Sequence, residues 1–567
     1  MSAEIRSLRQ PARGRRLIRR AALAFGFFVL LCAGWNAASA QTAQGGQAPE
    51  HYTVDGNGVD VIRGTFNFSA TDVTIGPEAS GLSYTRTVAG EVNRSNLDGL
   101  IEAQITGEIS PGQYSWGYEA SVGPSSENFT ATSPGEMGSQ SANGSTLSFN
   151  NGIYTHIDAA GTVRLFDASL ANPPTWQTQT PPNGPGGRIT RLTKPDGERW
   201  DWHYRSATFG TAPPVHRIQS VTSTRGYQIK FEYAFNGTPA SQSQLDAFGQ
   251  VTKVLAINNA VDYCDPQADV CAGFTQNWPS ATYARTQIST NVSRLDVTNA
   301  LNETTGYVTQ WDPFGSLGSA LAEIDWAEPG RASTVLSYDP QFRVSQYSDG
   351  RGSWTYVYTP DGNAQTTTVT DPNSQQTTYR ARLRSGPVGY EVEQQRLLWI
   401  RNAENETTYT QYDGNGRLTQ VTFPEGNIAR TTYDARGNVI EVRQIAKPSA
   451  PASDVITTAS FATTCTNRVT CNQPSSRTDA RGAVTDYTYD SVHGGLLTET
   501  GPVQVNGIRP QNRYSYQQAS AWYRNTPSSG FSQSPAIWIR TQSSACATAA
   551  PTPGCASSRS CARASGR

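Results

Sequence analysis

The sequence predicts an all-β protein built mainly from one extended antiparallel sheet. The 567 residues are poor in charge (16%) and rich in Thr, Ser, Gln, Asn and Gly, with 10% aromatic residues. This mixture suits exposed antiparallel strands joined by tight turns. Short runs of alternating apolar and polar residues recur, whereas helix-length apolar patterns are almost absent. A turn motif that begins Tyr-Asp also recurs, which indicates repeats.

Residues 1–40 have the pattern of a signal peptide. Seven arginines and no acidic residue lie between positions 6 and 20, and an apolar run at 21–33 follows. Ala38 and Ala40 give the small-x-small pattern of a cleavage site, so we expect cleavage between Ala40 and Gln41. A membrane anchor is the competing interpretation, but the apolar run is shorter than the roughly 20 residues that span a bilayer.

We therefore expect export through a Sec-type signal peptide, to the cell surface or as a secreted protein, with no integral membrane segment after cleavage. The chain has a formal charge of −1, and the signal contributes seven arginines and Glu4, so the mature chain is at about −7. No basic run is visible in the body of the sequence. Nucleic-acid binding, which needs clustered positive charge, is therefore not expected.

The mature chain divides into three parts. Residues 41–187 form a β-rich N-terminal region with strand-like runs at 64–69 and 81–86, and it ends in a Pro/Gly-rich linker. Residues 188–545 are repetitive. Residues 546–567 form a low-complexity tail rich in Ala, Ser, Arg and Cys.

The repeats are clearest at two units 21 residues apart, 412–418 and 433–439, each followed by an alternating run. A third unit at 478–484 leads into further alternation, and degenerate copies stand at 245–251, 311–315 and 338–340. The segment 299–305 also closely matches 402–408. The candidate motif residues are Tyr412, Asp413, Gly416, Tyr433, Asp434, Gly437, Asp479, Gly482, Tyr489 and Asp490.

The physical basis of each unit is a turn between two strands. Asp caps the turn with its carboxylate, and the Gly three residues later takes a positive φ that L-residues avoid. The tyrosine ends the preceding strand with its ring on the buried face. A single hairpin is only marginally stable in water, but stacked hairpins bury each other's apolar faces.

These motifs resemble those of the RHS (YD-repeat) protein family, in the pattern YDxxGR/NL/V at 412–418 and 433–439. The resemblance covers about 188–545, and the segment 59–86 looks like the lead-in of such secreted arrays. In this family the array winds as a β-sheet spiral into a large shell. The resemblance therefore implies an extended antiparallel β-sheet spiral preceded by a small β-rich N-terminal region.

The family suggests two functions. One is an exported structural or interaction protein, a shell scaffold for which surface glycans are candidate partners, because related repeats on animal cell surfaces act in adhesion and sugar binding. The other is the N-terminal shell portion of a polymorphic toxin-delivery protein, whose C-terminal core and toxin domain are absent here. Either way, we expect no enzyme activity from this chain itself.

The toxin-carrying members end the array with a DPxGL-type self-cleavage motif. The nearest match, at 312–317, has one residue too many before the leucine and lies in mid-array. We interpret it as an ordinary turn. The unusual tail is also compatible with a truncated or frameshifted gene product.

Cysteine usage fits an oxidising compartment. Six of the cysteines fall into close pairs, and Cys561 is left over. The spacings are not CxxC and no histidine lies near, so disulfides are favoured over a metal. The candidate disulfides are Cys264–Cys271, Cys465–Cys471 and Cys546–Cys555.

Catalytic, metal and cofactor sites are not indicated by the sequence. The histidines at 51, 156, 203, 216 and 493 stand in no metal-binding or nucleophile pattern, and no GxSxG is present. Paired carboxylates for glycoside cleavage stay open, because they need not be close in sequence. The Asp-rich loops at 55–58 and 361–363 are interpreted as turns rather than calcium sites, since the EF-hand and RTX spacings are missing.

Two aromatic rows offer the best indication of a partner. In each row three rings alternate along one strand and so share a sheet face. One interpretation is that they pack inside the shell, and the other is that they stack on sugar rings. The candidate residues are Trp200, Trp202 and Tyr204, and Trp354, Tyr356 and Tyr358.

Overall fold

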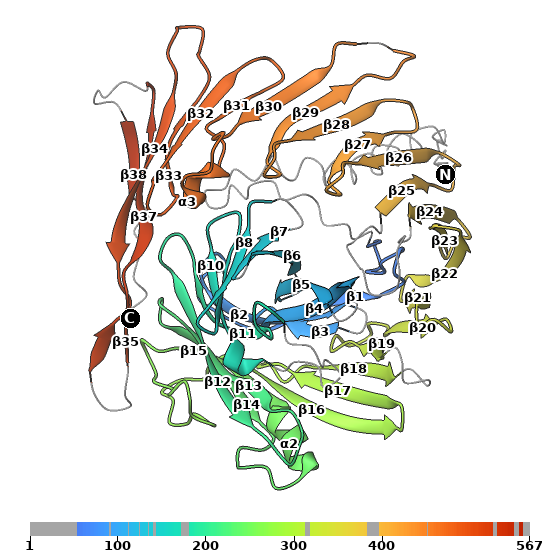
Figure 1. Ribbon diagram of the computed structural model, residues 1–567, viewed down its shortest axis with the longest axis vertical. Coiled ribbons are helices and arrows are strands. Elements are labelled where there is room, and N and C mark those ends of the chain that lie inside the picture. The colour runs from blue at the N-terminus through green and yellow to red at the C-terminus, as the bar shows by residue number, and fades with distance from the viewer. Residues whose placement is uncertain are drawn as a thin grey trace, which may run out of the picture.

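The computed structural model describes residues 54–89, 92–110, 113–123, 125–133, 135–139, 143–171, 181–311, 318–382, 396–450, 452–524, 530–548 and 555–559. The predicted signal peptide with its Ala40–Gln41 cleavage site, the turn at 312–317, His51 and Cys561 lie outside these residues. The all-β prediction is confirmed, since almost every element is an antiparallel strand (Figure 1). No helix among the described residues is long and apolar enough to cross a membrane.

A small sheet comes first, followed by a closed ring of strands. The small sheet consists of β1 (Asn67–Ile75), β2 (Leu82–Ala89) and β3 (Val92–Ser95). The ring consists of β4 (Gly99–Ser110), β5 (Gln113–Val122), β6 (Ser125–Ser133), β7 (Glu136–Ser139), β8 (Thr146–Asn150), β9 (Ile153–Ile157), β10 (Val163–Asp167) and β11 (Gly187–Thr193). Each ring strand pairs with the next, and β11 closes the ring by pairing with β4 at Gly187↔Ile101 and Arg188↔Leu100.

From β11 the same sheet continues as a long curved ribbon, in which sequential strands pair with one another. Its strands are β12 (Arg199–Ala207), β13 (Val215–Ser223), β14 (Tyr227–Tyr233), β15 (Val251–Asn258), β16 (Ser280–Ser289), β17 (Val292–Thr298), β18 (Thr304–Trp311), β19 (Ser319–Asp325), β20 (Thr334–Tyr338), β21 (Val344–Asp349), β22 (Gly352–Asp361), β23 (Ala364–Thr370), β24 (Gln376–Arg382), β25 (Arg396–Arg401), β26 (Thr407–Tyr412), β27 (Leu418–Thr422), β28 (Ile428–Tyr433), β29 (Val439–Ile445), β30 (Val455–Ser460), β31 (Ser476–Thr478), β32 (Val484–Tyr489), β33 (Leu496–Thr500), β34 (Gln511–Ala519), β37 (Ile537–Cys546) and β38 (Cys555–Arg559). A separate hairpin, β35 (Trp522–Arg524) with β36 (Phe531–Gln533), lies between β34 and β37.

The ribbon makes a turn around the N-terminal strands and returns to its own beginning (Figure 1). The backbone N–H of Trp538 in β37 donates to the carbonyl of Asp196, in the loop before β12, at 2.8 Å. The backbone N–H of Arg524 in β35 donates to the carbonyl of Asn259, just after β15, at 2.8 Å. The end of the ribbon is thereby bonded to its start.

The lead-in segment, residues 54–89 and 92–95, lies against the inner face of this turn. Thr367 Oγ1 donates to the carbonyl of Val61 at 2.6 Å, and Gln365 Nε2 donates to that of Ile62 at 2.8 Å. Farther along, Tyr283 donates to Asp72 Oδ2 at 2.6 Å. These bonds join residues about three hundred positions apart in the first case and about two hundred in the last.

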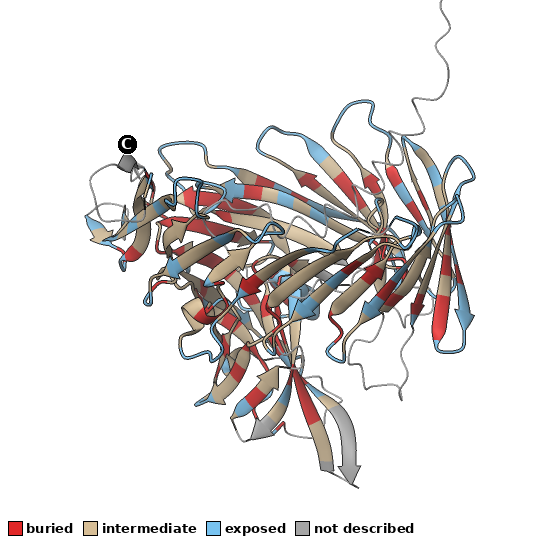
Figure 2. Cartoon of the chain, turned by 90° about the horizontal axis from the view of Figure 1, so that it is seen from above, coloured by how far each residue is buried: buried red, intermediate tan, exposed pale blue. Residues whose placement is uncertain are grey.

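The hydrophobic core is continuous only through the first part of the ribbon. Its buried residues run from Val59 in the lead-in to Ala381 in β24, and among the described residues none from later strands joins this cluster. Buried residues along the later strands, such as Val421 and Ala429, alternate with intermediate and exposed ones (Figure 2).

Helices are few and short: η1 (Ala168–Leu170), α2 (Gln242–Gly249) and α3 (Arg468–Cys471). The α2 helix corrects one prediction, because 245–251 is not a repeat turn. The hydroxyl of Ser241 caps the helix by accepting from the Gln244 N–H at 3.3 Å, and Leu245 and Phe248 bury one helical face.

Candidate functional site: repeat turns and the inner face

The repeat turns are held by the aspartate carboxylate. Asp413 Oδ1 accepts from the backbone N–H groups of Asn415 and Arg417, both at 2.9 Å, and the Gly416 N–H donates to the Asp413 carbonyl at 3.0 Å. Gly416 has φ +83°, in the left-handed region. Burial raises the pKa of Asp413, but the hydrogen bonds from Arg417 outweigh it and hold this pKa below its usual value.

The other motif aspartates and glycines follow the same geometry with one exception. Asp434 and Asp479 each accept two backbone hydrogen bonds in the same way, and Gly437 and Gly482 have φ of +83° and +78°. Asp490 instead accepts from the N–H groups of Val492 and His493 in a different loop.

Two of the repeat tyrosines, Tyr433 and Tyr489, are hydrogen-bonded to backbone carbonyls earlier in the chain. Tyr433 donates its hydroxyl proton to the carbonyl of Leu418 at 2.9 Å, and Tyr489 donates to that of Pro474 at 3.0 Å, fifteen residues back in both cases. The ring of Tyr433 also lies under the guanidinium of Arg417. Arg417 Nη1 donates to the Asp434 carbonyl at 3.1 Å, as Arg396 Nη1 donates to the Asp413 carbonyl at 3.2 Å.

The role of this arginine in joining two repeats was not predicted from the sequence. Arg417 bonds its own turn through Asp413 Oδ2 at 2.6 Å and also the turn of the next repeat. The motif pattern contains the arginine, but its partner is a tyrosine sixteen residues later. Only the hairpin register reveals that the two residues meet.

The six candidate stacking rings all pack on the main core. Trp202, Tyr356 and Tyr358 are buried, and Trp200, Tyr204 and Trp354 are partly buried against the same cluster. The polar atoms of four of these rings are also hydrogen-bonded: for example, Trp202 Nε1 donates to the Leu97 carbonyl at 2.7 Å, and Tyr356 donates to Asp55 Oδ2 at 2.6 Å. The packing interpretation accounts for these rings, because the lead-in and ring strands cover them.

Farther along the ribbon the same sheet face is only half covered. The register carries the face of Tyr356 and Val369 through Tyr379, Ile400 and Thr408 to the strands that follow. There Thr410, Val421, Ala429 and Ala459 are buried, whereas most other residues on this face are neither fully buried nor fully exposed. Examples of these inner-face residues are Thr431, Val442, Thr457, Arg477 and Tyr487.

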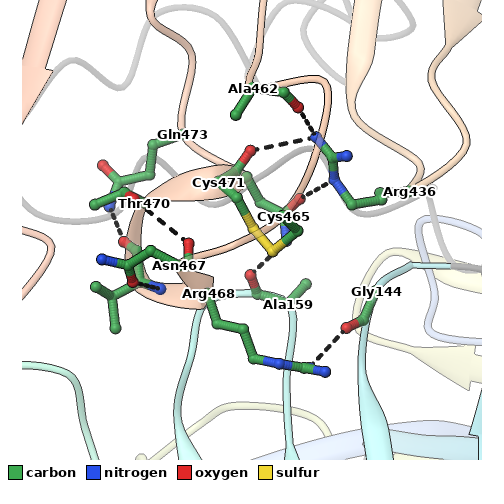
Figure 3. The surroundings of a disulfide bond; sticks show 12 residues. Gly144, Ala159, Arg436, Ala462, Cys465, Asn467, Arg468, Thr470, Cys471 and Gln473 are labelled. Atoms are coloured by element: carbon green, nitrogen blue, oxygen red, sulfur yellow. Dashed lines mark hydrogen bonds between the residues drawn. A yellow bond between two sulfur atoms is a disulfide. The ribbon is translucent and has the colours of Figure 1, made fainter. Parts of the chain in front are cut away.

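The disulfides Cys264–Cys271 and Cys465–Cys471 are both present. The second lies at α3, where the repeat array meets the N-terminal ring (Figure 3). Arg468 Nη1 donates to the Gly144 carbonyl at 3.0 Å, and Asn472 Nδ2 donates to the Ala159 carbonyl at 2.7 Å. The third pair, Cys546 and Cys555, faces across β37 and β38 in register.

The first disulfide closes a loop over a buried lysine. Lys230 Nζ donates to the carbonyls of Pro266, at 3.2 Å, and Ala268, both within the loop 264–271. Burial lowers the pKa of Lys230 to about 8. Gln219 Nε2 and Ser220 Oγ donate to the same two carbonyls.

One buried polar network contains the residue types of a hydrolase site. Glu127 lies 3.2 Å from His156 Nε2 and accepts from the hydroxyls of Ser139 and Ser145. Burial raises the pKa of Glu127, but the bonds from His156 and Ser145 bring it below its usual value. The hydroxyls are bonded to the carboxylate and not to the imidazole, so the network lacks the nucleophile–base contact that acyl transfer needs. Within the described ranges no cluster of three or more His, Cys, Asp or Glu could hold a metal ion.

Comparison with known proteins gives one family match. Residues 412–446 match the model of the RHS repeat. No curated protein matches this chain. Among solved structures, TcdB2-TccC3-TEV is similar over 92% of this chain and 25% of its own, with 12% identity and a TM-score of 0.28.

Two further structures are similar in the same way. A Tc holotoxin pore from Photorhabdus luminescens is matched over 82% of this chain and 24% of its own, with 11% identity and a TM-score of 0.27. TcdB2-TccC3 is matched over 84% of this chain and 35% of its own, with 11% identity and a TM-score of 0.24. The chain thus spans about a quarter to a third of the length of these structures.

Proposed function

We propose that this chain, which carries RHS repeats, is the exported shell portion of a toxin-delivery protein, and that its turn of sheet encloses a polypeptide segment of the longer protein. In this proposal the shell has no catalytic step of its own, and any enzyme activity belongs to the enclosed segment.

The observation that carries the proposal is the unequal covering of one continuous sheet face. Along β16–β24 this face is covered by the chain's own lead-in, through bonds such as Thr367 to Val61. Along β26–β32 the same face continues with half-buried side chains such as Val442, Thr457 and Tyr487, beside the buried Val421, Ala429 and Ala459. The opposite face of these strands carries exposed residues, for example Arg430 and Thr432.

An antiparallel sheet commonly packs one face and leaves the other in water. Here the exposed residues lie on the outer face. The inner face is therefore the one whose apolar side chains would be buried by a packing partner. A polypeptide lying across it would bury the Val and Tyr side chains and contribute roughly 25 cal/mol for each Å² of apolar surface removed from water. The bonds of Trp538 and Arg524 to the start of the ribbon close the turn around such a segment.

Two adjacent threonines on β28 give a matched test. Thr431 faces inward with Ala429, and Thr432 faces outward with Arg430. Thr431→Cys and Thr432→Cys are made both in residues 41–567 alone and in the complete product of the gene, and maleimide labelling is compared with the unmodified protein. We expect Thr431→Cys to be labelled in the chain alone and protected in the complete product, with Thr432→Cys labelled in both.

Equal labelling of Thr431→Cys in the two proteins would overturn the enclosure, as would a gene product that ends with this chain. Export is tested separately by the N-terminal sequence of the mature protein, which is expected to begin at Gln41. An intact N-terminus in the exported fraction would contradict cleavage at that site.

A further inference from the structure

The loop between β30 and β31 joins the repeat array to the N-terminal ring (Figure 3). It contains the short helix α3 and one disulfide. Arg468 Nη1 donates to the Gly144 carbonyl at 3.0 Å, and Asn472 Nδ2 donates to the Ala159 carbonyl at 2.7 Å. The partners are 324 and 313 positions apart in the chain. This loop therefore bridges two parts of the protein that are distant in sequence.

The same loop also holds the repeat turn 434–438 through Arg436. Arg436 Nη1 donates to the Thr463 carbonyl at 3.1 Å, and its Nη2 donates to the Cys471 carbonyl at 3.4 Å. Its Nε donates to Asn472 Oδ1 at 3.0 Å. All three acceptors belong to the loop, so these charge-assisted bonds form together only while the loop keeps one conformation.

Secondary structure alone does not fix this conformation. The helix α3 has four residues, Arg468–Cys471, and an isolated helix of that length is unstable in water. The disulfide joins Cys465 to Cys471, six positions apart, and so closes the chain around the helix. A closed ring of this kind removes the open conformations of the loop. The disulfide thereby keeps the donors to the ring and the acceptors of Arg436 in place.

The disulfides Cys465–Cys471 and Cys264–Cys271 differ in how a reductant reaches them. Cys465 is exposed, although its partner Cys471 is 3% exposed. In the other disulfide Cys264 is 1% exposed and Cys271 is half-buried, and both pack in a small apolar cluster. Thiol–disulfide exchange requires a thiolate to reach a sulfur, and exposed disulfides are the more easily reduced. Cys465 offers such a sulfur.

We propose that the disulfide Cys465–Cys471 is a redox-sensitive clasp between the repeat array and the N-terminal ring. In an oxidising compartment the clasp is closed. A dithiol reductant, of the class that keeps cytosolic thiols reduced, opens it. One thiolate of the reductant attacks the Cys465 sulfur, and Cys471 leaves as a thiolate. The second thiol then displaces Cys465, so the protein gains two electrons and two protons while the dithiol becomes a disulfide.

Opening of the clasp is a local event. The strand pairs from β29 to β32 lie outside the loop, so reduction frees one edge of the ribbon without unfolding the sheet. The clasp joins parts of this chain to one another and does not depend on the proposed enclosure. It makes the same shell closed under oxidising conditions and loosened under reducing ones.

The first test is reduction of residues 41–567 by dithiothreitol, with the freed thiols alkylated and quantified by mass spectrometry. We expect Cys465 and Cys471 to be alkylated at least about tenfold faster than Cys264 and Cys271, because their disulfide is the exposed one. Equal rates for the two disulfides would overturn the selective opening.

Hydrogen exchange then measures whether reduction releases the ring. The amides of 158–161, in the ring loop that the clasp contacts, are compared before and after this one disulfide is reduced. We expect exchange there to become at least about tenfold faster, the effect of removing a short-loop constraint. Exchange in β14, at 227–233, is expected to stay unchanged. Unchanged exchange at 158–161, or a rise that includes β14, would overturn the clasp.

Two matched double variants repeat the comparison without a reductant. Cys465→Ser with Cys471→Ser is expected to show the fast exchange at 158–161 and no further response to dithiothreitol. Cys264→Ser with Cys271→Ser opens a loop of similar length, with a separation of seven against six, and should leave 158–161 unchanged. Slow exchange in the first variant, or fast exchange in the second, would contradict the proposal. Should the first variant not fold, reduction of the unmodified protein decides alone.

Discussion

The guanidinium carbon of Arg417 lies 5.0 Å from the centroid of the Tyr433 ring, which belongs to the next repeat. The same pairing occurs between Arg217 and Tyr233 at 4.2 Å and between Arg343 and Tyr358 at 4.4 Å. In all three cases the tyrosine hydroxyl donates to a backbone carbonyl beside the arginine. Consecutive hairpins are thus joined by a cation–π contact and a hydrogen bond, in addition to the strand ladder.

Arg417→Ala is expected to lower the free energy of unfolding by about 2 kcal/mol, because it removes a hydrogen bond to each of two turns and the cation–π contact. Urea denaturation followed by tryptophan fluorescence measures this, and hydrogen exchange of amides 407–445 locates it. Arg481→Ala is the control: its exposed side chain extends from the corresponding loop, and the change should stay within about 0.5 kcal/mol. Equal effects of both variants would contradict the joining role.

Gly482→Ala tests the energetic cost of a left-handed backbone conformation at the turn, because the added methyl group would meet no neighbouring atom. Gly482 has φ +78°, and an added Cβ would meet nothing within 4 Å. We expect a loss of about 1 kcal/mol from backbone strain alone. Ser374 has φ +63° at the matching position of another turn, so Ser374→Gly should be neutral or stabilise by a few tenths of a kcal/mol. Thermal unfolding compares the two, and a destabilising Ser374→Gly would speak against the strain argument.

The stability of the protein is expected to rise with pH in a window set by Lys230. Burial lowers its pKa from 10.5 to about 8, so between these values the unfolded chain binds more protons than the folded one. The free energy of unfolding therefore increases with pH in this window, by at most roughly 1.4 kcal/mol per pH unit. Below pH 8 both states are protonated and the slope disappears. Lys230→Met should abolish the slope in urea denaturation between pH 8 and 10; an unchanged slope would refute this.

Replacing Cys264 and Cys271 by alanine is expected to lower the free energy of unfolding by about 2–3 kcal/mol, the entropic effect of opening a short loop. The loop also supplies the two carbonyls that accept from Lys230, so its loosening should expose that amine. Acetylation of Lys230, measured by mass spectrometry, should rise in the double variant and stay low in the unmodified protein. Protection of Lys230 in the double variant would show that the loop holds without the disulfide.

The turns and strands, which depend on residues close together in the chain, could be predicted from the sequence. The contacts between residues far apart in the chain could not. The turns at Asp413 and Asp434 were predictable because the cap, the glycine and the alternating strand all lie within a few residues. The prediction of a repeat turn at 245–251 was wrong because an Asp-x-x-Gly spacing also fits a short helix. The residue that caps this helix, Ser241, lies outside the repeat pattern.

The two faces of the sheet were harder to assign. The two-residue period of the strand shows that Trp354, Tyr356 and Tyr358 share a face, but only their packing against the lead-in segment shows that this face is the inner one. The outward-facing Trp399 and Tyr409 are ten residues apart, and no periodicity connects the two. The pair arises from the register of β25 and β26.

The hydrogen bonds that Gln365 and Thr367 of β23 donate to the carbonyls of Ile62 and Val61 hold the first described residues against the inner face of the turn. Hairpins joined edge to edge have no intrinsic reason to close at one radius, since each adds only a small rotation to the one before. Where the lead-in packs against the ribbon, up to β24, it therefore sets the curvature of the sheet. Lengthening or removing the lead-in should change the curvature of the strands that pack on it.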